Sequence, residues 1–263
     1  MIFFVAVAGL QFPTTLPAQN VAVQTVAANP VESRGWFLRP KGPQQHGIMP
    51  SFEQYLPNAS RIFTTPSNLY YLAAGAGLAG LLRPFDDDIV EDVAQENNHE
   101  AVFGTLNAMG NFFFVGGASV ATYLIGRASS RNELSNTGLY LTQAFLTQQL
   151  LTFIIKEAVD RRRPNGKNLS FPSGHAANAF TVASVLAVRH GPKIGIPAYV
   201  VASLIGVARV RTNKHFPSDV VAGATLGIIV GRSFVAPEDR RNSLAVAPFV
   251  DFGHVGLNMH YSF

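Results

Sequence analysis

The residues best suited to chemistry surround one short segment, Pro172-Ser173-Gly174-His175, which precedes an apolar run over 176–188. The run predicts a helix, and Ser173 is a favourable N-cap for it. Because the unpaired N–H groups of the first turn and the helix dipole act at the same point, this helix end predicts an anion site. His175 would lie at the rim of that site with a titratable nitrogen. An ordinary capped helix would explain the segment equally well if it stood alone.

Two flanking segments add the charges that an anion site needs. Upstream, six residues separate Lys156 from Arg163, and a proline follows the arginine. Downstream, five residues separate Arg209 from His215, and three more separate His215 from Asp219. Three cations, two histidines and a carboxylate are therefore predicted around one helix end.

The ordered set Lys-x6-Arg-Pro, Pro-Ser-Gly-His and Arg-x5-His-x3-Asp resembles the motifs of the type 2 phosphatidic acid phosphatase and vanadium haloperoxidase superfamily. One Lys-x6-Arg-Pro motif would be a weak signal, but all three motifs in order and with the family's spacing are specific. One departure is visible, because Ala208 precedes Arg209 where the family usually has serine. That serine is a supporting position, so we count its loss as minor.

The cations and the helix end suit the binding of a phosphoryl group. Phosphoryl transfer needs positive charge around three oxygens, an in-line nucleophile and a proton for the leaving oxygen. Arg163 and Arg209 can each bind oxygens with two N–H groups, and Lys156 adds a point charge. Ser173 and the N–H of Gly174 complete the predicted phosphate site, because a side chain at position 174 would keep the phosphate from the backbone.

The two histidines suit the chemical steps. The spacing of His215 and Asp219 at a helix start predicts a carboxylate beside one ring nitrogen, which fixes the tautomer and leaves the other nitrogen as nucleophile. His175 would protonate the leaving alcohol and then activate water. The resemblance implies these same roles, with a phosphohistidine intermediate and no metal, so we expect no cofactor.

Composition restricts the class of protein. Of the 263 residues, 48% are hydrophobic and only 14% are charged, which is low for a soluble protein of this size. Such a composition suits a helical core with little exposed surface, or one partly held by a bilayer. The formal charge of +4 is mild and the basic residues form no stripe, so we expect no nucleic-acid partner. The absence of cysteine excludes disulfides, thiolate catalysis and Cys-based zinc sites.

The first 66 residues differ from the rest of the chain. Residues 1–28 carry no charge and begin with an apolar run like the core of a secretion signal, although basic residues do not precede it. The alternatives are a weak anchor or a buried N-terminal element. The apolar run of about ten residues is too short to span a membrane. Recurring prolines over 29–66 predict an extended lead-in or short amphipathic pieces.

Residues 67–236 predict the helical phosphatase domain. The glutamines of its third apolar run would be poorly tolerated by lipid, and the last three runs are short of the roughly 20 residues of a span. We expect an all-α fold, a compact bundle of about six helices. Three aspartates at 86–88 suggest Ca²⁺ or Mg²⁺, but they precede an amphipathic stretch, and we favour helix capping. The apolar runs lie at 69–82, 101–126, 134–155, 176–188, 194–208 and 220–231.

Residues 237–263 change in character. Apolar and polar residues alternate around Gly253, which predicts a short β-hairpin-like tail. The final residues, 260–263, resemble the aromatic ends of bacterial outer-membrane barrel proteins, but two strands cannot form a barrel. We expect an appendage that packs on the bundle or on a partner.

These features predict a metal-independent phosphatase of the bacterial cell envelope, associated with the membrane and acting on phosphomonoesters or diphosphates, with lipid phosphates among the candidate substrates. A vanadate-dependent haloperoxidase is one alternative, because vanadate fits the same site as phosphate. A non-catalytic envelope protein that binds a partner through its tail is another, although the complete set of motif residues argues against it. The substrate, the oligomeric state and the choice between a spanning, peripheral or free periplasmic protein stay open.

Overall fold

A computed structural model describes residues 50–94, 100–235, 244–251 and 254–261. Helices dominate, so the expected all-α class is confirmed, but the described residues form nine α-helices where about six were expected. The predicted signal-like segment 1–28 lies outside the described residues, and the domain boundaries stay predictions. The helices are α1 (Pro50–Thr64), α2 (Pro66–Leu82), α3 (Asp86–Ala94), α4 (Glu100–Met109), α5 (Phe112–Ala128), α6 (Asn132–Val159), α7 (Gly174–His190), α8 (Pro192–Arg211) and α9 (Pro217–Phe234), with a 3₁₀ turn, η1 (Arg83–Phe85), between α2 and α3.

The sequence patterns placed several helix ends incorrectly. Helix α1, of 15 residues, forms inside the proline-rich segment, for which an extended lead-in or short amphipathic pieces were expected. The single run at 101–126 is two helices, α4 and α5, bent by 53° at a break that contains Gly110 and Asn111. In addition, α8 has 20 residues and includes Arg209, because the helix continues through polar residues that the apolar run did not count.

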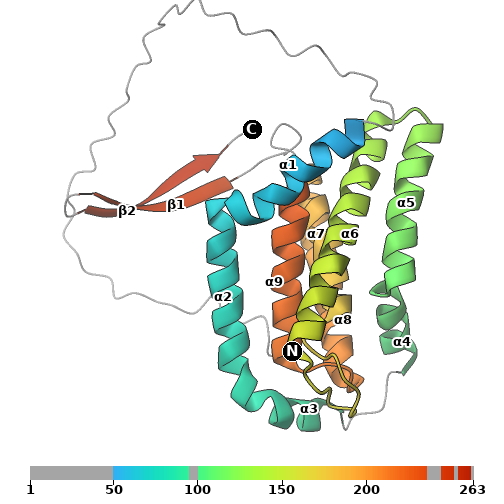
Figure 1. Ribbon diagram of the computed structural model, residues 1–263, viewed down its shortest axis with the longest axis vertical. Helices are drawn as coiled ribbons and strands as arrows, with labels where there is room; N and C mark the ends of the chain where they lie inside the picture. Colours follow the sequence, from blue (N-terminus) through green and yellow to red (C-terminus); the bar gives the residue numbers. More distant parts are fainter. Residues whose placement is uncertain (1–49, 95–99, 236–243, 252–253, 262–263) are drawn as a thin grey trace, which may run out of the picture. The chain divides into compact units, whose positions relative to one another are not determined.

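The inner part of the bundle is the pair α7 and α9, which pack on each other along their lengths (Figure 1). Three glycines of α9 follow one another at every fourth position, at 223, 227 and 231. A methyl group at any of them would lie 2.3–2.6 Å from a carbonyl oxygen of α7 or of its N-cap Ser173. Such distances are far inside van der Waals contact, so glycine is required for this approach of the two backbones.

Other helices surround the inner pair. Helix α9 also contacts α1, α2 and α6, while α8 packs on α7 and α5 packs on α6. The largest apolar cluster joins α1, α6, α7 and α9 around Phe234, and a second joins α7 to α8 around Ile205. The two helices that begin at the predicted site are therefore held from several sides.

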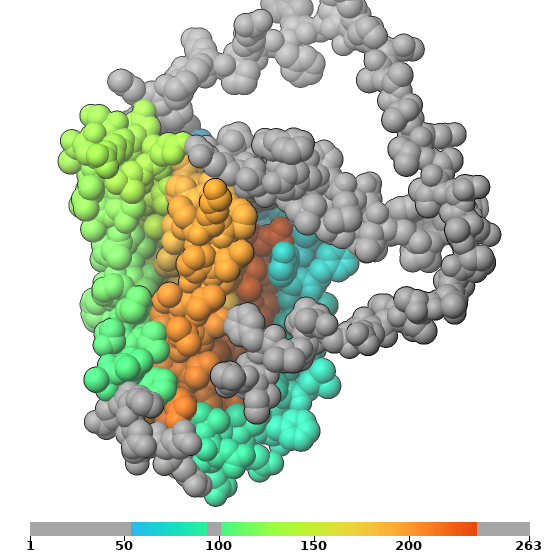
Figure 2. Space-filling view, turned by 180° about the vertical axis from the view of Figure 1, so that it is seen from behind, coloured from blue at the N-terminus to red at the C-terminus, as the bar shows by residue number. Residues whose placement is uncertain are grey.

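The outer helices α2, α5, α6 and α8 expose many large apolar side chains. Figure 2 looks onto the face where α8, in orange, is exposed. Helix α8 is long and apolar enough to cross a membrane, and the bent pair α4–α5 would be a second such segment if it counts as one span. These two assignments are based on the length and the composition of the helices. Exposed apolar residues of these four helices include Leu69, Leu72, Leu78, Leu81, Phe112, Phe113, Phe114, Leu124, Leu146, Leu150, Phe153, Ile194, Ile196, Val200 and Leu204.

Two strands follow the helices. Strands β1 (Leu244–Asp251) and β2 (His254–Tyr261) pair antiparallel, with Leu244 opposite Tyr261 and Asp251 opposite His254. The expectation that this tail packs on the bundle or on a partner stays a prediction.

Candidate active site

The N-terminal end of α7 has the predicted cap. The Ser173 side chain accepts a hydrogen bond from the N–H of Ala176, which confirms it as N-cap. The N–H of Ser173 in turn donates to the carbonyl of Asp219 at 2.9 Å. Because Asp219 lies in the first turn of α9, this bond joins the starts of the two inner helices.

Two predicted cations come from α6 and the loop after it. Lys156 lies in the last turn of α6, and its Nζ donates to the carbonyl of Leu169 at 2.5 Å. Arg163 Nη2 points to the same oxygen at 3.4 Å. A Cβ built on Gly174 would lie 4.0 Å from Lys156 Cε, so the glycine at the start of α7 faces this lysine.

The third cation, Arg209, comes from the last turn of α8. Its Nη1 donates to Asn107 Oδ1 of α4 at 2.9 Å. Within the described residues, Arg209 Nε, Arg163 Nε and His215 Nδ1 are buried without a hydrogen-bond partner. Buried polar groups are rarely left unpaired, so two guanidinium donors at one site indicate a place for a bound anion.

His215 and Asp219 face each other at the start of α9. His215 Nδ1 lies 3.7 Å from Asp219 Oδ2, which is too long for a hydrogen bond but close enough for a strong electrostatic contact. Asp219 Oδ2 instead accepts from the Ser170 hydroxyl at 2.5 Å and from the Phe216 N–H at 3.0 Å. The carboxylate is thus adjacent to the ring, as the spacing predicted, but it is held by other donors.

Burial and the surrounding cations change the protonation of the site. Burial lowers the pKa of His215 to about 4, and the facing Asp219 carboxylate opposes this shift without overcoming it. Burial, Arg209, His215, Arg163 and Lys156 lower the pKa of His175 to about 3. Both rings are therefore neutral at pH 7 when the site is empty, since each charged form would be poorly solvated among like charges.

The pKa values of the other two charged groups also move. Burial and the neighbouring Arg163 lower the pKa of Lys156 to about 8, although Asp219 opposes them. For Asp219, burial raises the pKa, but His215, Ser170, the Phe216 N–H and Arg161 together outweigh it and leave the pKa below its usual value. The carboxylate stays ionised at neutral pH.

The structure thus brings all eight predicted residues together around the N-terminal ends of α7 and α9, and their chemical roles stay predictions. Sequence reasoning missed four further polar residues of this region, which are Asp86, Asn107, Arg161 and Ser170. The sequence offered a signal for two of them, because Asp86 begins the aspartate run and Arg161 begins an arginine run. Asp86 does lie in the first turn of α3, but its carboxylate binds Ser218 of α9.

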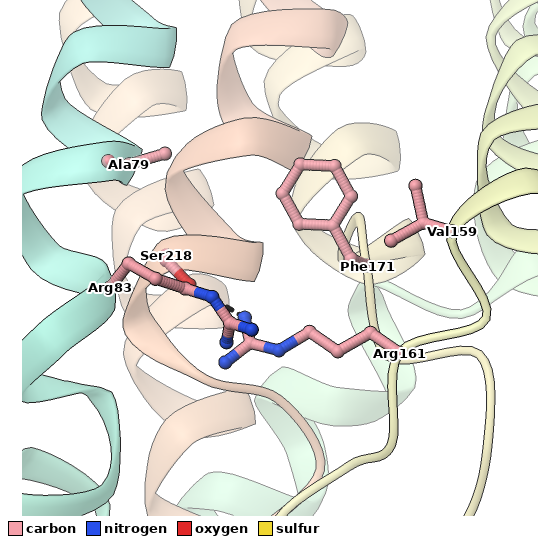
Figure 3. Close-up of a pocket in the computed structure, with 7 residues that line it drawn as sticks. Ala79, Arg83, Val159, Arg161, Phe171 and Ser218 are labelled. Atoms are coloured by element: carbon pink, nitrogen blue, oxygen red, sulfur yellow. Dashed lines mark hydrogen bonds between the residues drawn. The ribbon is translucent and has the colours of Figure 1, made fainter.

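A pocket of about 420 Å³ lies beside these residues, between α2, the end of α6 and the start of α9. Figure 3 shows Arg83 and Arg161 with their guanidinium groups close together below Ala79, Val159 and Phe171. None of the eight predicted residues lines this pocket. Among the described residues, no group of three His, Asp or Glu side chains could hold a metal ion.

Two bacterial phosphatases are similar to parts of this chain. The lipid A 1-phosphatase of Porphyromonas gingivalis is 41% identical over 80 residues, which cover 29% of this chain and 18% of that protein. Phosphatidylglycerophosphatase B of Bacillus subtilis is 37% identical over 109 residues, or 35% of this chain and 54% of that protein. The chain thus spans about half or less of these two relatives.

A more distant relative and a solved structure have similar descriptions. Undecaprenyl-diphosphatase BcrC of Bacillus subtilis is 27% identical over 50% of this chain and 69% of its own length. The crystal structure of a transmembrane PAP2 type phosphatidylglycerolphosphate phosphatase from Bacillus subtilis covers 70% of this chain and 91% of its own, with a TM-score of 0.46 and 23% identity. The profile of the PAP2 superfamily matches residues 137–242, which contain all three motifs. Residues 137–242, which carry the site, therefore match the PAP2 superfamily.

Proposed function

We propose that this chain is a membrane-associated phosphatase that removes phosphate from a lipid phosphomonoester or diphosphate through a phosphohistidine. The observation that carries the proposal is the pair Arg163 and Arg209, whose buried Nε donors have no hydrogen-bond partner, beside two neutral histidines at one helix end. Such an arrangement is poorly satisfied when empty and well satisfied by a phosphate dianion.

Binding comes first in the proposed reaction. The phosphate oxygens take the free donors of Arg163 and Arg209, the charge of Lys156 and the N–H groups at the start of α7. A bound dianion also favours the charged form of His175, because it offsets the cations that lower the pKa of this ring to about 3 in the empty site. Substrate binding therefore helps to supply the acid that the reaction needs.

The chemical steps follow from the two rings. Since Nδ1 of His215 faces Asp219, Nε2 is the atom that attacks phosphorus, and the bond from phosphorus to the lipid oxygen breaks. The leaving oxygen takes a proton from His175, which is then neutral. Neutral His175 accepts a proton from water as that water attacks phosphorus, so the P–N bond breaks and inorganic phosphate leaves with His215 restored. The cations act throughout as the charge clamp, and no metal is required.

Two observations support a lipid substrate and a membrane location. The outer helices expose large apolar side chains, which suits contact with lipid, and α8 is long enough to cross a bilayer. The named relatives act on lipid A, phosphatidylglycerophosphate and undecaprenyl diphosphate. We therefore place the reaction on a lipid phosphate, in the cell envelope of a bacterium.

The test measures phosphate release from phosphatidic acid, phosphatidylglycerophosphate and undecaprenyl diphosphate in detergent micelles with excess chelator. His215→Ala should abolish release from every substrate. His175→Ala should abolish release from lipids but should slow the first-turnover release of the alcohol from an activated aryl phosphate much less, because that leaving oxygen needs little protonation. His190→Ala, at the far end of α7, is the control and should retain wild-type turnover. Equal damage by His175→Ala on both substrate types would contradict the assignment of acid and nucleophile.

Vanadate provides an independent test of the same site. It readily becomes five-coordinate and resembles the transition state, so it should compete with substrate and bind more tightly, by a factor on the order of 10² or more. Arg163→Lys should weaken its binding because an ammonium group cannot reproduce the two parallel N–H bonds. Bromide oxidation with added vanadate, in an enzyme that releases no phosphate, would favour the haloperoxidase alternative instead.

A further inference from the structure

Arg161 lies outside the three motifs, yet it is buried between two carboxylates. Its Nη1 donates to Asp219 Oδ1 at 2.6 Å, and its Nη2 donates to Asp86 Oδ2 at 2.8 Å. Its guanidinium also stacks on the ring of Phe216, 4.0 Å from the ring centre. Only 10% of the side chain is exposed. Both terminal nitrogens of this arginine therefore bind side chains of the protein.

Asp86 fixes the other end of this link. It is 1% exposed and begins α3, 75 residues before Arg161 in the chain. Its Oδ1 accepts from the N–H of Ser218 at 3.0 Å, and the Ser218 hydroxyl donates to its Oδ2. Arg161 Nη1 also donates to that hydroxyl at 2.8 Å, and Figure 3 shows the arginine reaching Ser218. The first turn of α9 is thus held from two sides.

The contacts of Asp219 divide between its two oxygens. Arg161 binds Oδ1, whereas Ser170 and the Phe216 N–H bind Oδ2, the oxygen that faces His215. Without Arg161, Oδ1 would lose its hydrogen-bonded cation, and the two hydrogen bonds on Oδ2 would remain. The hydrogen bonds on Oδ2 alone do not fix the plane of the group.

We propose that Arg161, anchored by Asp86, is a positioning residue that orients the Asp219 carboxylate toward His215. This inference rests on the proposed function, in which His215 is the nucleophile. A buried arginine between two carboxylates can also serve folding alone, since removal of one partner of a buried ion pair is strongly destabilising. The experiment must therefore separate positioning from stability.

A double-mutant cycle provides that separation. In the wild-type background, Arg161→Met should lower kcat by roughly 10- to 100-fold and change KM by less than about threefold. The reason is that the substitution disturbs the orientation of the His215 ring, which reacts, and not the groups that bind the substrate. In the Asp219→Asn background, the same change should cost less than about threefold, since Arg161 acts through a carboxylate that is already gone. Equal losses in both backgrounds would overturn the proposal.

The chain offers matched controls. Arg162 is exposed and binds only the carbonyl of Gly166 among the contacts described, so Arg162→Met should leave kcat unchanged. Asp86→Asn keeps the shape and an oxygen for the Ser218 N–H, and it tests the anchor if Arg161→Met does not fold. It should lower kcat by roughly 3- to 10-fold, and the exposed neighbour substitution Asp87→Asn should not. Wild-type kcat in folded Asp86→Asn would overturn the anchoring.

Vanadate affinity, measured by calorimetry on the same variants, makes the failure of this inference distinguishable from failure of the proposed function. Arg161→Met should weaken vanadate binding by about tenfold in the wild-type background and by much less with Asp219→Asn. If no lipid phosphate is hydrolysed, the proposed function fails but this cycle still decides the role of Arg161. If phosphate release depends on His215 and both cycles are additive, only the positioning role fails.

Discussion

The inner helix pair and the outer helices have similar apolar content, but they differ in which apolar side chains they expose. Helices α7 and α9, all of whose residues the structure describes, expose no large apolar side chain and approach through glycine and alanine. Helices α2, α5 and α8 expose many leucine, phenylalanine, isoleucine and valine side chains. The inner pair therefore depends on the size of each residue, because its helix ends must hold the charged site in place. The outer helices depend mainly on apolar character.

Adjacent residues of α8 give the largest expected contrast. Ile205 is 3% exposed and packs in the cluster between α7 and α8, while Leu204 is 47% exposed. Ile205→Ala should lower the free energy of unfolding by about 2–5 kcal/mol, because it leaves a cavity. Leu204→Ala should change it by less than about 0.5 kcal/mol. Unfolding in micelles followed by circular dichroism measures both, and similar losses would remove the distinction between inner and outer faces.

Glycines provide the second contrast. Gly227→Ala should lower the free energy of unfolding by about 1–3 kcal/mol, because its methyl group would lie 2.5 Å from the Ala177 carbonyl oxygen. Gly117 of α5 has no atom within 4 Å of the corresponding position. Gly117→Ala should therefore be neutral or raise stability by up to about 1 kcal/mol, since alanine favours the helix. Tolerance of Gly227→Ala would mean that the two inner helices do not pack this closely.

A third prediction concerns the contact between helix α4 and the site. Asn107→Ala removes the oxygen that holds Arg209 Nη1, so kcat/KM for a lipid phosphate should fall by about tenfold. The control is Thr105→Ala on the same helix, because the Thr105 hydroxyl bonds only the carbonyl of Ala101 among the contacts described. Steady-state kinetics decide the matter, and equal kcat/KM for the two variants would show that Asn107 does not orient Arg209.

The smallest expected effect at neutral pH concerns Lys156. Its pKa is lowered to about 8, so the charge is present below pH 8 and is lost as the pH rises above it. Wild-type kcat/KM should therefore fall above pH 8, by about tenfold per pH unit at most. In Lys156→Arg the fall should move to higher pH, because a guanidinium keeps its proton. Lys193→Arg, on the exposed start of α8, should keep the wild-type profile, and an unchanged profile in Lys156→Arg would assign the fall to another group.

Much of the site could be predicted because its signals are local. The Ser173 cap, the start of α7 and the proximity of His215 to Asp219 depend on residues a few positions apart. Helix ends were harder to place, because a helix continues through polar residues when tertiary contacts satisfy them. Thus α8 extends to include Arg209, whose side chain is held by Asn107. The break between α4 and α5 was not predicted, because a Gly-Asn pair within an apolar run can lie inside a helix or at its end.

The sequence by itself determined which chemical groups are available, since residue types and spacing predict an anion site with two histidines and a carboxylate. Only the tertiary structure decided how that site is held. Asp86 reaches Ser218 across 132 positions, and Asn107 reaches Arg209 across 102. No local pattern encodes such pairs, because they depend on the angle and depth at which whole helices pack. The glycines of α9 allow the close approach of α9 to α7.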